Sequence, residues 1–361
     1  RVARAEATEA SARATEAADF LSGVLRTADP VQTDGQPITT REALDLSLDR
    51  IPEIASPKLR GQLLTTIGDI YGFMGEYDRA DSLLTEAVRV LNTAAPGSEA
   101  LYEAHHELGR VRWAMGDTEE AERRFRLVYD EAGAGTYVRT SAVLSIYGLY
   151  EALGRPDDAL PWAQQFYAAV QEEGGGPGDV AYALGALGAA LHGVGRSQEA
   201  AEMLEEALRV IEDAWGLDNQ YAAQLHYSLS QAYLGAGDHE QAEAYALRML
   251  DWRRSKVPPG SPRLYQHWAE VAEVYDAIGQ SALAEAYADS FVTAAYTMFP
   301  DDGPRLALAH LTRSTIRDAA ARPQAARADA LAALRLAEAH GDSALVEAAR
   351  AQTDRLGQSA E

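Results

Sequence analysis

The residues with the clearest capacity for chemistry stand together in the segment YEAHHELG, which contains His105, His106 and Glu107. Histidine and glutamate side chains bind zinc when two of them lie three or four residues apart on one helix face. Adjacent helical residues point about 100° apart, so His105 and His106 do not form such a pair. In the repeat described below, His105, His226 and His310 occupy equivalent positions, which predicts that they pack inside the fold.

Other signatures of catalysis are incomplete. The glycine-rich segments GAGTY from Gly133 and GGGPGD from Gly174 lack the GK[ST] sequence that completes a phosphate-binding loop. The sequence has no HRD or DFG triplet of the kind protein kinases carry, and it has no cysteine. Paired acidic residues such as Glu119 and Glu120 are typical of a solvated helix face. The sequence therefore predicts no catalytic residue, no metal site and no cofactor.

The elements that carry these residues follow a repeat. A glycine followed five residues later by alanine recurs every 38 to 42 residues. Glycine at a helix C-terminus adopts the left-handed conformation at little cost, and alanine allows two helices to cross closely. The pattern therefore predicts helix–turn–helix units. The seven copies are MGEYDRA from Met74, MGDTEEA from Met115, LGRPDDA from Leu153, VGRSQEA from Val194, AGDHEQA from Ala236, IGQSALA from Ile278 and a degenerate AARPQAA from Ala320.

The helix expected before each glycine has its apolar residues on one face. In the first unit these are Leu64, Ile67, Gly68 and Tyr71. This large–large–small–aromatic order, with glycine at the turn and alanine on the second helix, resembles the tetratricopeptide repeat (TPR) across about residues 57–340. The resemblance implies an all-α fold, a right-handed TPR superhelix (α-solenoid) of about seven helix-turn-helix repeats. Its first helices would line a concave face.

Some positions depart from the TPR pattern. The third unit has Tyr147 where a small residue is expected, and Arg112 and Arg317 stand in aromatic positions, so the seventh unit is the least typical. The connectors between later units also repeat and resemble those of kinesin-light-chain-type repeats. They are WGLDNQYAA from Trp215, VPPGSPRLY from Val257 and FPDDGPRLA from Phe299.

Segments outside the array predict its two ends. Residues 40–55 read as a helix with a threonine N-cap that packs on the first repeat. Residues 342–356 read as a closing helix that covers the last apolar face. The predicted organisation is an N-terminal helical stalk and linker over 1–39, the array with its leading helix over 40–340, and a capping helix and tail over 341–361.

The positions opposite the core of each first helix predict a binding groove. Amide, arginine, histidine and aromatic side chains at these positions suit an extended peptide, because amides pair with its backbone and aromatics receive its side chains. Only one cation stands among them, which disfavours the TPR mode that holds a terminal carboxylate. The predicted groove residues are Glu103, His106, Arg110, Trp113, Tyr182, His192, Gln224, Tyr227, Gln231 and Glu273.

The charge balance narrows the classes of partner. The chain has 32 basic and 55 acidic residues, a net charge of −23. Nucleic acid and anionic lipid both require a cationic surface, so the sequence argues against both and allows a basic partner. The simplest interpretation is a solvated acidic surface. No run of about 18 apolar residues is present, so this chain predicts no direct membrane insertion.

Roughly residues 10–90 carry a second resemblance. The order TEAADFLSGVLRTADP, a polar gap and TTREALDLSLDRI is similar to the region after the transmembrane helix in bacterial serine/threonine protein kinases with C-terminal TPRs. The resemblance implies a cytoplasmic kinase domain and one membrane span upstream of Arg1, so that this chain is a soluble, non-catalytic extracytoplasmic sensor or scaffold. It also allows a homodimer through the N-terminal helix. The matching residues are Phe20, Leu21, Asp29, Pro30, Thr40, Arg41, Glu42, Leu44 and Asp45.

Two other functions stay open at the level of sequence. A free-standing, cytoplasmic TPR scaffold or adaptor without a kinase needs only the array. An enzyme would need a site formed within the groove, for which no motif is present.

Overall fold

The structure, a computed structural model, describes residues 39–256 and 265–358, and every regular element in them is a helix. The helices fall into two compact units, within residues 1–173 and 174–361, and each unit is described by itself. The predicted stalk lies outside the described residues up to position 38. Its apolar residues Phe20 and Leu21, and the homodimer expected through it, therefore stay predictions.

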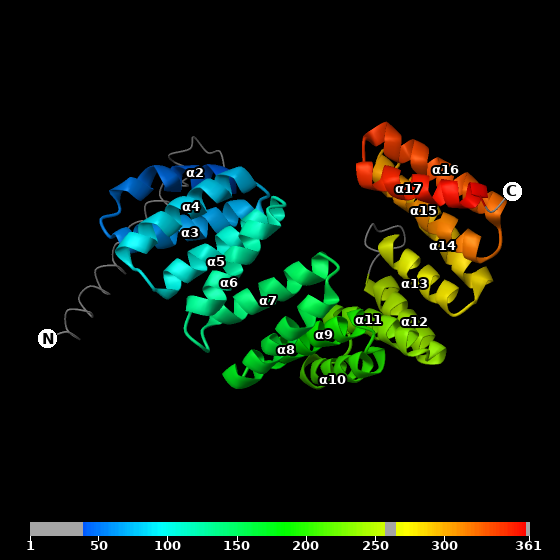
Figure 1. The fold of residues 1–361 in the computed structure, drawn as a ribbon, viewed down its shortest axis with the longest axis horizontal. Helices are drawn as coiled ribbons and strands as arrows, with labels where there is room; N and C mark the ends of the chain where they lie inside the picture. Colours follow the sequence, from blue (N-terminus) through cyan, green and yellow to red (C-terminus); the bar gives the residue numbers. More distant parts are fainter. Residues whose placement is uncertain (1–38, 257–264, 359–361) are drawn as a thin grey trace. The chain divides into compact units, whose positions relative to one another are not determined.

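The first unit contains a leading helix, a short 3-10 turn and three helix pairs (Figure 1). In each pair, two helices are joined by a tight turn and pack along each other. The elements are α2 (Thr40–Arg50), η1 (Ile51–Glu53), α3 (Pro57–Phe73), α4 (Tyr77–Ala94), α5 (Glu99–Ala114), α6 (Thr118–Glu131), α7 (Tyr137–Ala152) and α8 (Pro156–Glu173).

The second unit contains four further pairs and a final helix, so the described residues form the seven pairs that the sequence predicts. The elements are α9 (Pro177–Gly193), α10 (Ser197–Trp215), α11 (Gln220–Ala236), α12 (His239–Lys256), α13 (Tyr265–Ala277), α14 (Ser281–Met298), α15 (Gly303–Ala319), α16 (Pro323–His340) and α17 (Ser343–Gln358).

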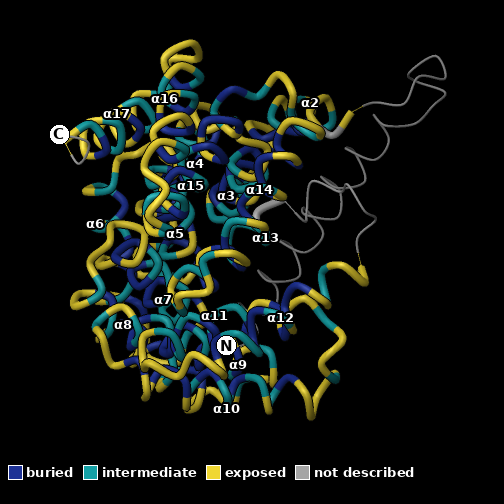
Figure 2. Tube along the Cα trace, turned by 90° about the vertical axis from the view of Figure 1, so that its right-hand side faces the viewer, coloured by how far each residue is buried: buried dark blue, intermediate teal, exposed yellow. Residues whose placement is uncertain are grey.

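Within each unit the first helices of neighbouring pairs contact one another and form a layer. The contacts run α3–α5–α7 in the first unit and α9–α11–α13–α15–α17 in the second. The second helix of a pair packs on its own first helix and on the first helix that follows. Figure 2 shows buried stretches along the helices and exposed turns between them. The binding residues predicted from the sequence stand on the helices of this layer.

The turn glycines have the predicted conformation. Six of the seven positions are glycines with positive φ, between 65° and 85°, and the alanines five residues later are almost completely buried. The degenerate seventh copy keeps the same geometry with Ala321 at φ 56°. This is a strained conformation for a residue with a Cβ atom. The turn conformation is therefore imposed by the helix pair and holds even without glycine.

Close helix crossing explains the small residue on the first helix. A Cβ atom added to Gly188 would lie 2.7 Å from Cγ of Leu204, which is too close for two carbon atoms. The third pair reverses the sizes: Tyr147 occupies the position of Gly188, and Ala163 occupies that of Leu204, with both side chains buried. The large residue at Tyr147 is therefore matched by a small one at the equivalent position of the facing helix.

The aromatic position of the first helix has a polar role that arginine can share. The hydroxyl of Tyr150 donates a hydrogen bond to Glu122 Oε1 of the preceding pair, at 2.6 Å. In the second helix pair, Arg112 stands at the aromatic position, and its Nε lies 2.6 Å from Asp81 Oδ1 of the preceding pair. Tyrosine and arginine thus both carry a donor to an acid on the previous second helix, which accounts for arginine in an aromatic position.

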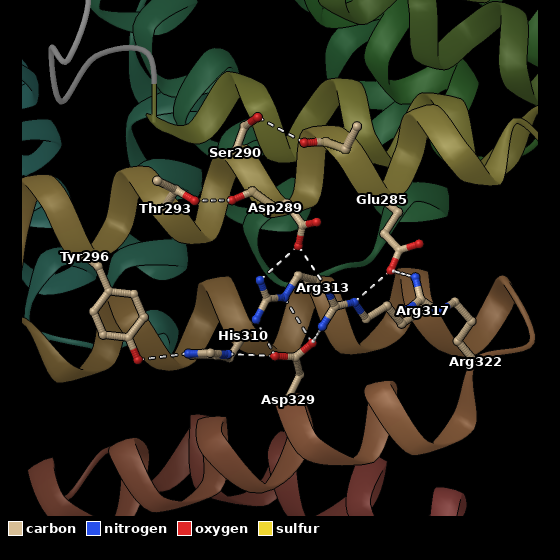
Figure 3. A network of polar contacts seen from close by, with 11 residues as sticks. Glu285, Asp289, Ser290, Thr293, Tyr296, His310, Arg313, Arg317, Arg322 and Asp329 are labelled. Atoms are coloured by element: carbon tan, nitrogen blue, oxygen red, sulfur yellow. Dashed lines mark hydrogen bonds and ion pairs between the residues drawn. The ribbon is translucent and has the colours of Figure 1, made fainter.

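The seventh pair extends this contact into a buried network that joins α14, α15 and α16 (Figure 3). The carboxylate of Asp329 is almost fully buried and lies 2.9 Å from His310 Nδ1, 2.6 Å from Arg313 Nη2 and 2.7 Å from Arg317 Nη1. Both guanidiniums also reach Asp289 of α14, at 2.9 and 3.0 Å. Burial raises the pKa of Asp329, but hydrogen bonds from His310 and Arg313 and the charges of both arginines outweigh it and lower that pKa to about 2.

The leading helix begins at Thr40, as predicted, but its N-cap is one residue earlier than expected and the helix ends earlier. Thr39 is the N-cap, and it forms a capping box with Glu42. Pro52 lacks a backbone N–H, so the α-helix gives way to η1 instead of continuing to residue 55. Leu44, Ile51 and Ile54 pack into the core of the first repeat, as the sequence predicts.

The last helix, α17, packs on α15 and α16. Its buried Leu356 forms an apolar cluster with Ala326 and Ala330 of α16. A closing helix that covers the end of the array is thus present at the predicted place.

Candidate binding surface

The ten predicted groove residues all lie on first helices, but they belong to two units. Four stand on α5 of the first unit, and six stand on α9, α11 and α13 of the second. Glu103, Tyr182, Gln224 and Glu273 are exposed. The half-buried residues are Arg110, Trp113, His192, Tyr227 and Gln231.

His106 is buried, so the expectation that it faces a groove is wrong. Its Nδ1 lies 3.1 Å from Glu107 Oε1, and its Nε2 lies 2.9 Å from Ser145 Oγ of α7. Because a carboxylate only accepts, Nδ1 donates to Glu107 and Nε2 accepts from the serine hydroxyl. Helix α5 packs against α3, α6 and α7, so its buried surface extends beyond the single stripe of core residues. His106 therefore links neighbouring first helices.

The three equivalent histidines are packing residues, as predicted. His105, His226 and His310 are all buried. Nη1 of Arg124 donates to Nδ1 of His105 at 2.8 Å, which requires a neutral imidazole. Burial, together with the nearby arginine charge, lowers the pKa of His105 to about 4, and the pKa of His226 falls to about 4 in the same way. Within the described part of the chain, no cluster of three histidine or acidic side chains could hold a metal ion.

Two predicted residues of the second unit are partly committed to packing. His192 Nδ1 lies 3.1 Å from Ser197 Oγ at the end of α9. Tyr227 packs beside the core that contains Val271 and Tyr275. Burial raises the pKa of Tyr227 to about 12, with a smaller contribution from nearby glutamates. Tyr182, with half of its surface exposed, is the aromatic side chain of the predicted set most available to a ligand in this unit.

The first unit has a hollow of about 450 Å³ on its first-helix layer, here called the α3–α5 hollow. Two predicted residues, Arg110 and Trp113, line it. The other lining residues come from α3, α4, α5 and α7: Asp69, Gly72, Phe73, Tyr77, Glu107, Val111, Ala114 and Ser145.

Charged side chains form one side of the α3–α5 hollow. Nη1 of Arg110 lies 2.6 Å from Glu107 Oε2 and 3.2 Å from Asp69 Oδ1, so one guanidinium bridges two carboxylates on neighbouring helices. Burial, followed by the charge and hydrogen bond of Glu107, raises the pKa of Asp69 to about 6. The hollow therefore has a carboxyl group that titrates near neutral pH.

Aromatic side chains form the other side of the hollow. Phe73 is 72% exposed, and the Arg110 guanidinium lies over its ring, 4.9 Å from the centroid. Trp113 packs against α7, where a Cβ atom on Gly148 would lie 3.4 Å from the indole. An aromatic side chain that is exposed to this extent, beside a second one held by backbone contact, provides area for a ligand at small entropic cost.

Sequence reasoning missed Asp69, Glu107 and Phe73 as members of this surface. The signal for Asp69 was present, because it stands six residues before its turn glycine, as Arg110, Gln231 and Glu273 do before theirs. The part played by Glu107 depends on how α5 rotates against α3, which the repeat spacing alone does not specify.

The helices of the described residues include none that is long and apolar enough to cross a lipid bilayer.

Comparisons with known proteins agree with this fold. Tetratricopeptide repeat models match residues 59–130, 142–213 and 223–256. The search of curated proteins finds no match.

Solved structures with a similar fold share little sequence with this chain. A tetratricopeptide repeat protein from Parabacteroides merdae is 17% identical with a TM-score of 0.56, over 80% of this chain and 98% of that chain. The apo quorum sensor NprR from B. thuringiensis is 12% identical with a TM-score of 0.58, over 95% and 99%. A Rap protein complexed with competence and sporulation factor is 9% identical with a TM-score of 0.52, over 97% and 98%. Together with the seven helix pairs, these comparisons show an all-helical TPR solenoid fold, with tetratricopeptide repeats over the matched residues.

Proposed function

We propose that this chain is a non-catalytic module that binds a peptide or an extended segment of a protein on its first-helix layer. The observation that carries this proposal is the α3–α5 hollow, where Phe73 and Trp113 stand beside the charged group of Asp69, Glu107 and Arg110. An aromatic wall next to paired polar groups suits recognition of an extended peptide. The Rap protein similar in fold is itself complexed with competence and sporulation factor, which supports a ligand-binding role for this fold.

The proposal also includes the context in which the module acts. The resemblance of residues 10–90 to bacterial membrane serine/threonine kinases supports a sensor or scaffold on the extracytoplasmic side of a single-pass kinase. Ligand binding on the array would then be passed on through the N-terminal stalk or through a homodimer. The gene sequence upstream of Arg1 tests this context: a kinase catalytic signature and an apolar span of about 20 residues are expected. Their absence would favour the free-standing scaffold instead.

Binding itself is tested by an immobilised octapeptide array probed with the purified chain and two single variants. Trp113→Ala removes a wall of the hollow and is expected to weaken capture of the bound peptides by at least about tenfold, as for a central aromatic anchor. Tyr137→Ala is the matched control, because Tyr137 is 80% exposed at the start of α7 and does not line the hollow. Equal capture by both variants, with unchanged circular dichroism, would remove the α3–α5 hollow as the binding surface.

The same array examines the second unit through Tyr182→Ala. Tyr182 of α9 is half exposed, and Tyr182→Ala should weaken capture of peptides that Trp113→Ala leaves unaffected if this unit has its own binding face. If Trp113→Ala and Tyr182→Ala weaken capture of the same peptides, the result would instead indicate one ligand that contacts both units.

A further inference from the structure

The α3–α5 hollow contains more acidic than basic groups. Asp69 of α3 and Glu107 of α5 face the single guanidinium of Arg110, and Glu107 Oε1 accepts from His106 as well. The remaining lining residues of α4 and α7, among them Tyr77 and Ser145, carry no charge at neutral pH. With both carboxyls ionised, the hollow therefore holds one negative charge that no cation of the lining balances.

The acidic character continues along α5. Glu103 stands one turn before Glu107, and Glu99 stands one turn before Glu103. Partial burial, followed by the charges of Glu99 and Glu107, raises the pKa of Glu103. The face of α5 that leads into the hollow thus presents three glutamates to a ligand and only Arg110 as a cation.

The aromatic wall favours the same sign of charge. The face of an aromatic ring attracts cations, and arginine and lysine are its usual partners in proteins. The hollow already accommodates one guanidinium in this way, since Arg110 lies over Phe73 while it contacts both carboxylates. Trp113 offers a second aromatic side chain next to the same carboxylates.

From this arrangement we infer that the α3–α5 hollow receives a cationic side chain, arginine or lysine, of an extended basic peptide. The inference rests on the proposed function and names the chemistry of its ligand. The incoming cation lies against Trp113 and Phe73 and pairs with the carboxylate of Asp69, while Arg110 stays paired with Glu107. A ligand anion would instead meet Asp69, Glu103 and Glu107, so acidic and phosphorylated peptides are excluded. The chain's net charge of −23 favours the approach of a basic partner.

Proton linkage follows from the position of Asp69. Its neighbours are Glu107 and Arg110 of α5, with Tyr77 of α4 and Ser145 of α7 on the remaining sides of the hollow. The pKa of Asp69 is about 6 in the free protein, so most molecules bind a proton there at pH 5 and few do at pH 7.5. A bound cation requires the ionised carboxylate, and its affinity therefore falls by about tenfold from pH 7.5 to pH 5.

The test uses four pools of fluorescein-labelled octapeptides that differ only in a fixed central residue: arginine, lysine, norleucine or glutamate. Fluorescence polarisation measures the binding of each pool to the full chain. The arginine and lysine pools should bind at least about tenfold more tightly than the norleucine pool, because a hydrogen bond to a charged group contributes this much. The preference should shrink at pH 5. The glutamate pool should bind most weakly.

Three variants locate the effect. Asp69→Asn conserves the shape and should reduce the preference for the cationic pools to about threefold or less, and Glu107→Gln provides a second reading if Asp69→Asn does not fold. Asp130→Asn, on the exposed face of α6, changes the net charge equally and should leave the preference intact.

The outcomes separate the two proposals. Binding that depends on Trp113 but shows no preference for arginine or lysine, or prefers glutamate, would overturn the cationic side chain and leave peptide binding standing. If Asp130→Asn reduces the preference as much as Asp69→Asn does, the preference comes from the net charge of the chain. That result would overturn the α3–α5 hollow as the site. Absence of binding in every pool would remove the proposed function of this surface and the inference with it.

Discussion

The buried carboxylate of Asp329 should make the end of the array sensitive to acid, and its substitution measures the effect. In the folded chain, contacts with His310, Arg313 and Arg317 lower the pKa of Asp329 from 3.8 to about 2 (Figure 3). A shift of this size corresponds to about 2 kcal/mol of preference for the ionised carboxylate. Asp329→Asn removes the charge but keeps the size, so it should destabilise the protein by about that amount. The two arginines keep Asp289 as a partner, which places the cost below the 3–5 kcal/mol typical of a broken buried pair.

The direction of the pKa shift determines how the stabilising contribution of Asp329 changes with pH. Because the folded pKa is lower than the unfolded one, the unfolded chain binds a proton first as the pH falls. The contribution of Asp329 is therefore complete above about pH 4, declines between about pH 4 and pH 2, and disappears below that range. Urea unfolding of wild type and Asp329→Asn, followed by circular dichroism at pH 7, 4 and 2, should show a difference of about 2 kcal/mol that shrinks only at the last pH.

A matched variant on the surface completes this experiment. Glu199 pairs with Arg196 at 2.6 Å, but both side chains are about half exposed, so Glu199→Gln should destabilise the protein much less than Asp329→Asn does at neutral pH. Hydrogen exchange at neutral pH should place the loss of protection in Asp329→Asn on α14, α15 and α16. An equal cost for the two variants at pH 7, or a difference that persists unchanged at pH 2, would refute the assigned role of the network.

Three further predictions concern the repeat and the hollow. Gly188→Ala should destabilise the protein by about 1–3 kcal/mol in urea unfolding, despite the better helix propensity of alanine, because its Cβ atom meets Leu204. The double variant with Leu204→Ala should cost about 1–2 kcal/mol less than the sum of the single variants, because the clash disappears. Ala321→Gly should stabilise by about 1 kcal/mol in the same assay, because it relieves a positive φ. In a carbon-13 NMR titration the pKa of the Asp69 carboxyl should be about 6 and should fall in Glu107→Gln, though not to the ordinary value, since burial remains.

The helix pairs could be predicted from sequence because the signals at their turns are local. A glycine at positive φ and an alanine at a close crossing each need only the residues of one pair, so the spacing located all seven turns. The departure at Tyr147 was also visible in the repeat register, whereas Ala163 is not exceptional, since Ala246, Ala288 and Ala330 stand at the same position of later pairs. A departure on one helix is best interpreted together with the equivalent position on its partner.

The candidate surface was less predictable because it depends on contacts between pairs. His106 stands opposite the core stripe of α5 in a helical projection, yet Ser145 of α7 covers it. Whether a neighbouring first helix covers such a position depends on the helix rotation and the spacing between pairs, neither of which a repeat length determines. The buried network of Asp329 has the same origin, because it joins side chains from three successive helices.

The repeat register also explains how one architecture can present a specific surface. The position six residues before the turn glycine carries Asp69, Arg110, Gln231 and Glu273 in different pairs, whereas the position five residues after it is always alanine. The alanine is fixed by helix packing, but the earlier position faces outward and is free to vary in charge. Because Asp69 and Arg110 occupy this outward position in adjacent pairs, the stacking of α3 on α5 brings them into contact without any specialised loop. The charges along the first-helix layer therefore depend strongly on the residue at one position in each repeat. In the first unit that position supplies Asp69 and Arg110, and Glu107, three residues before Arg110, adds the second carboxylate.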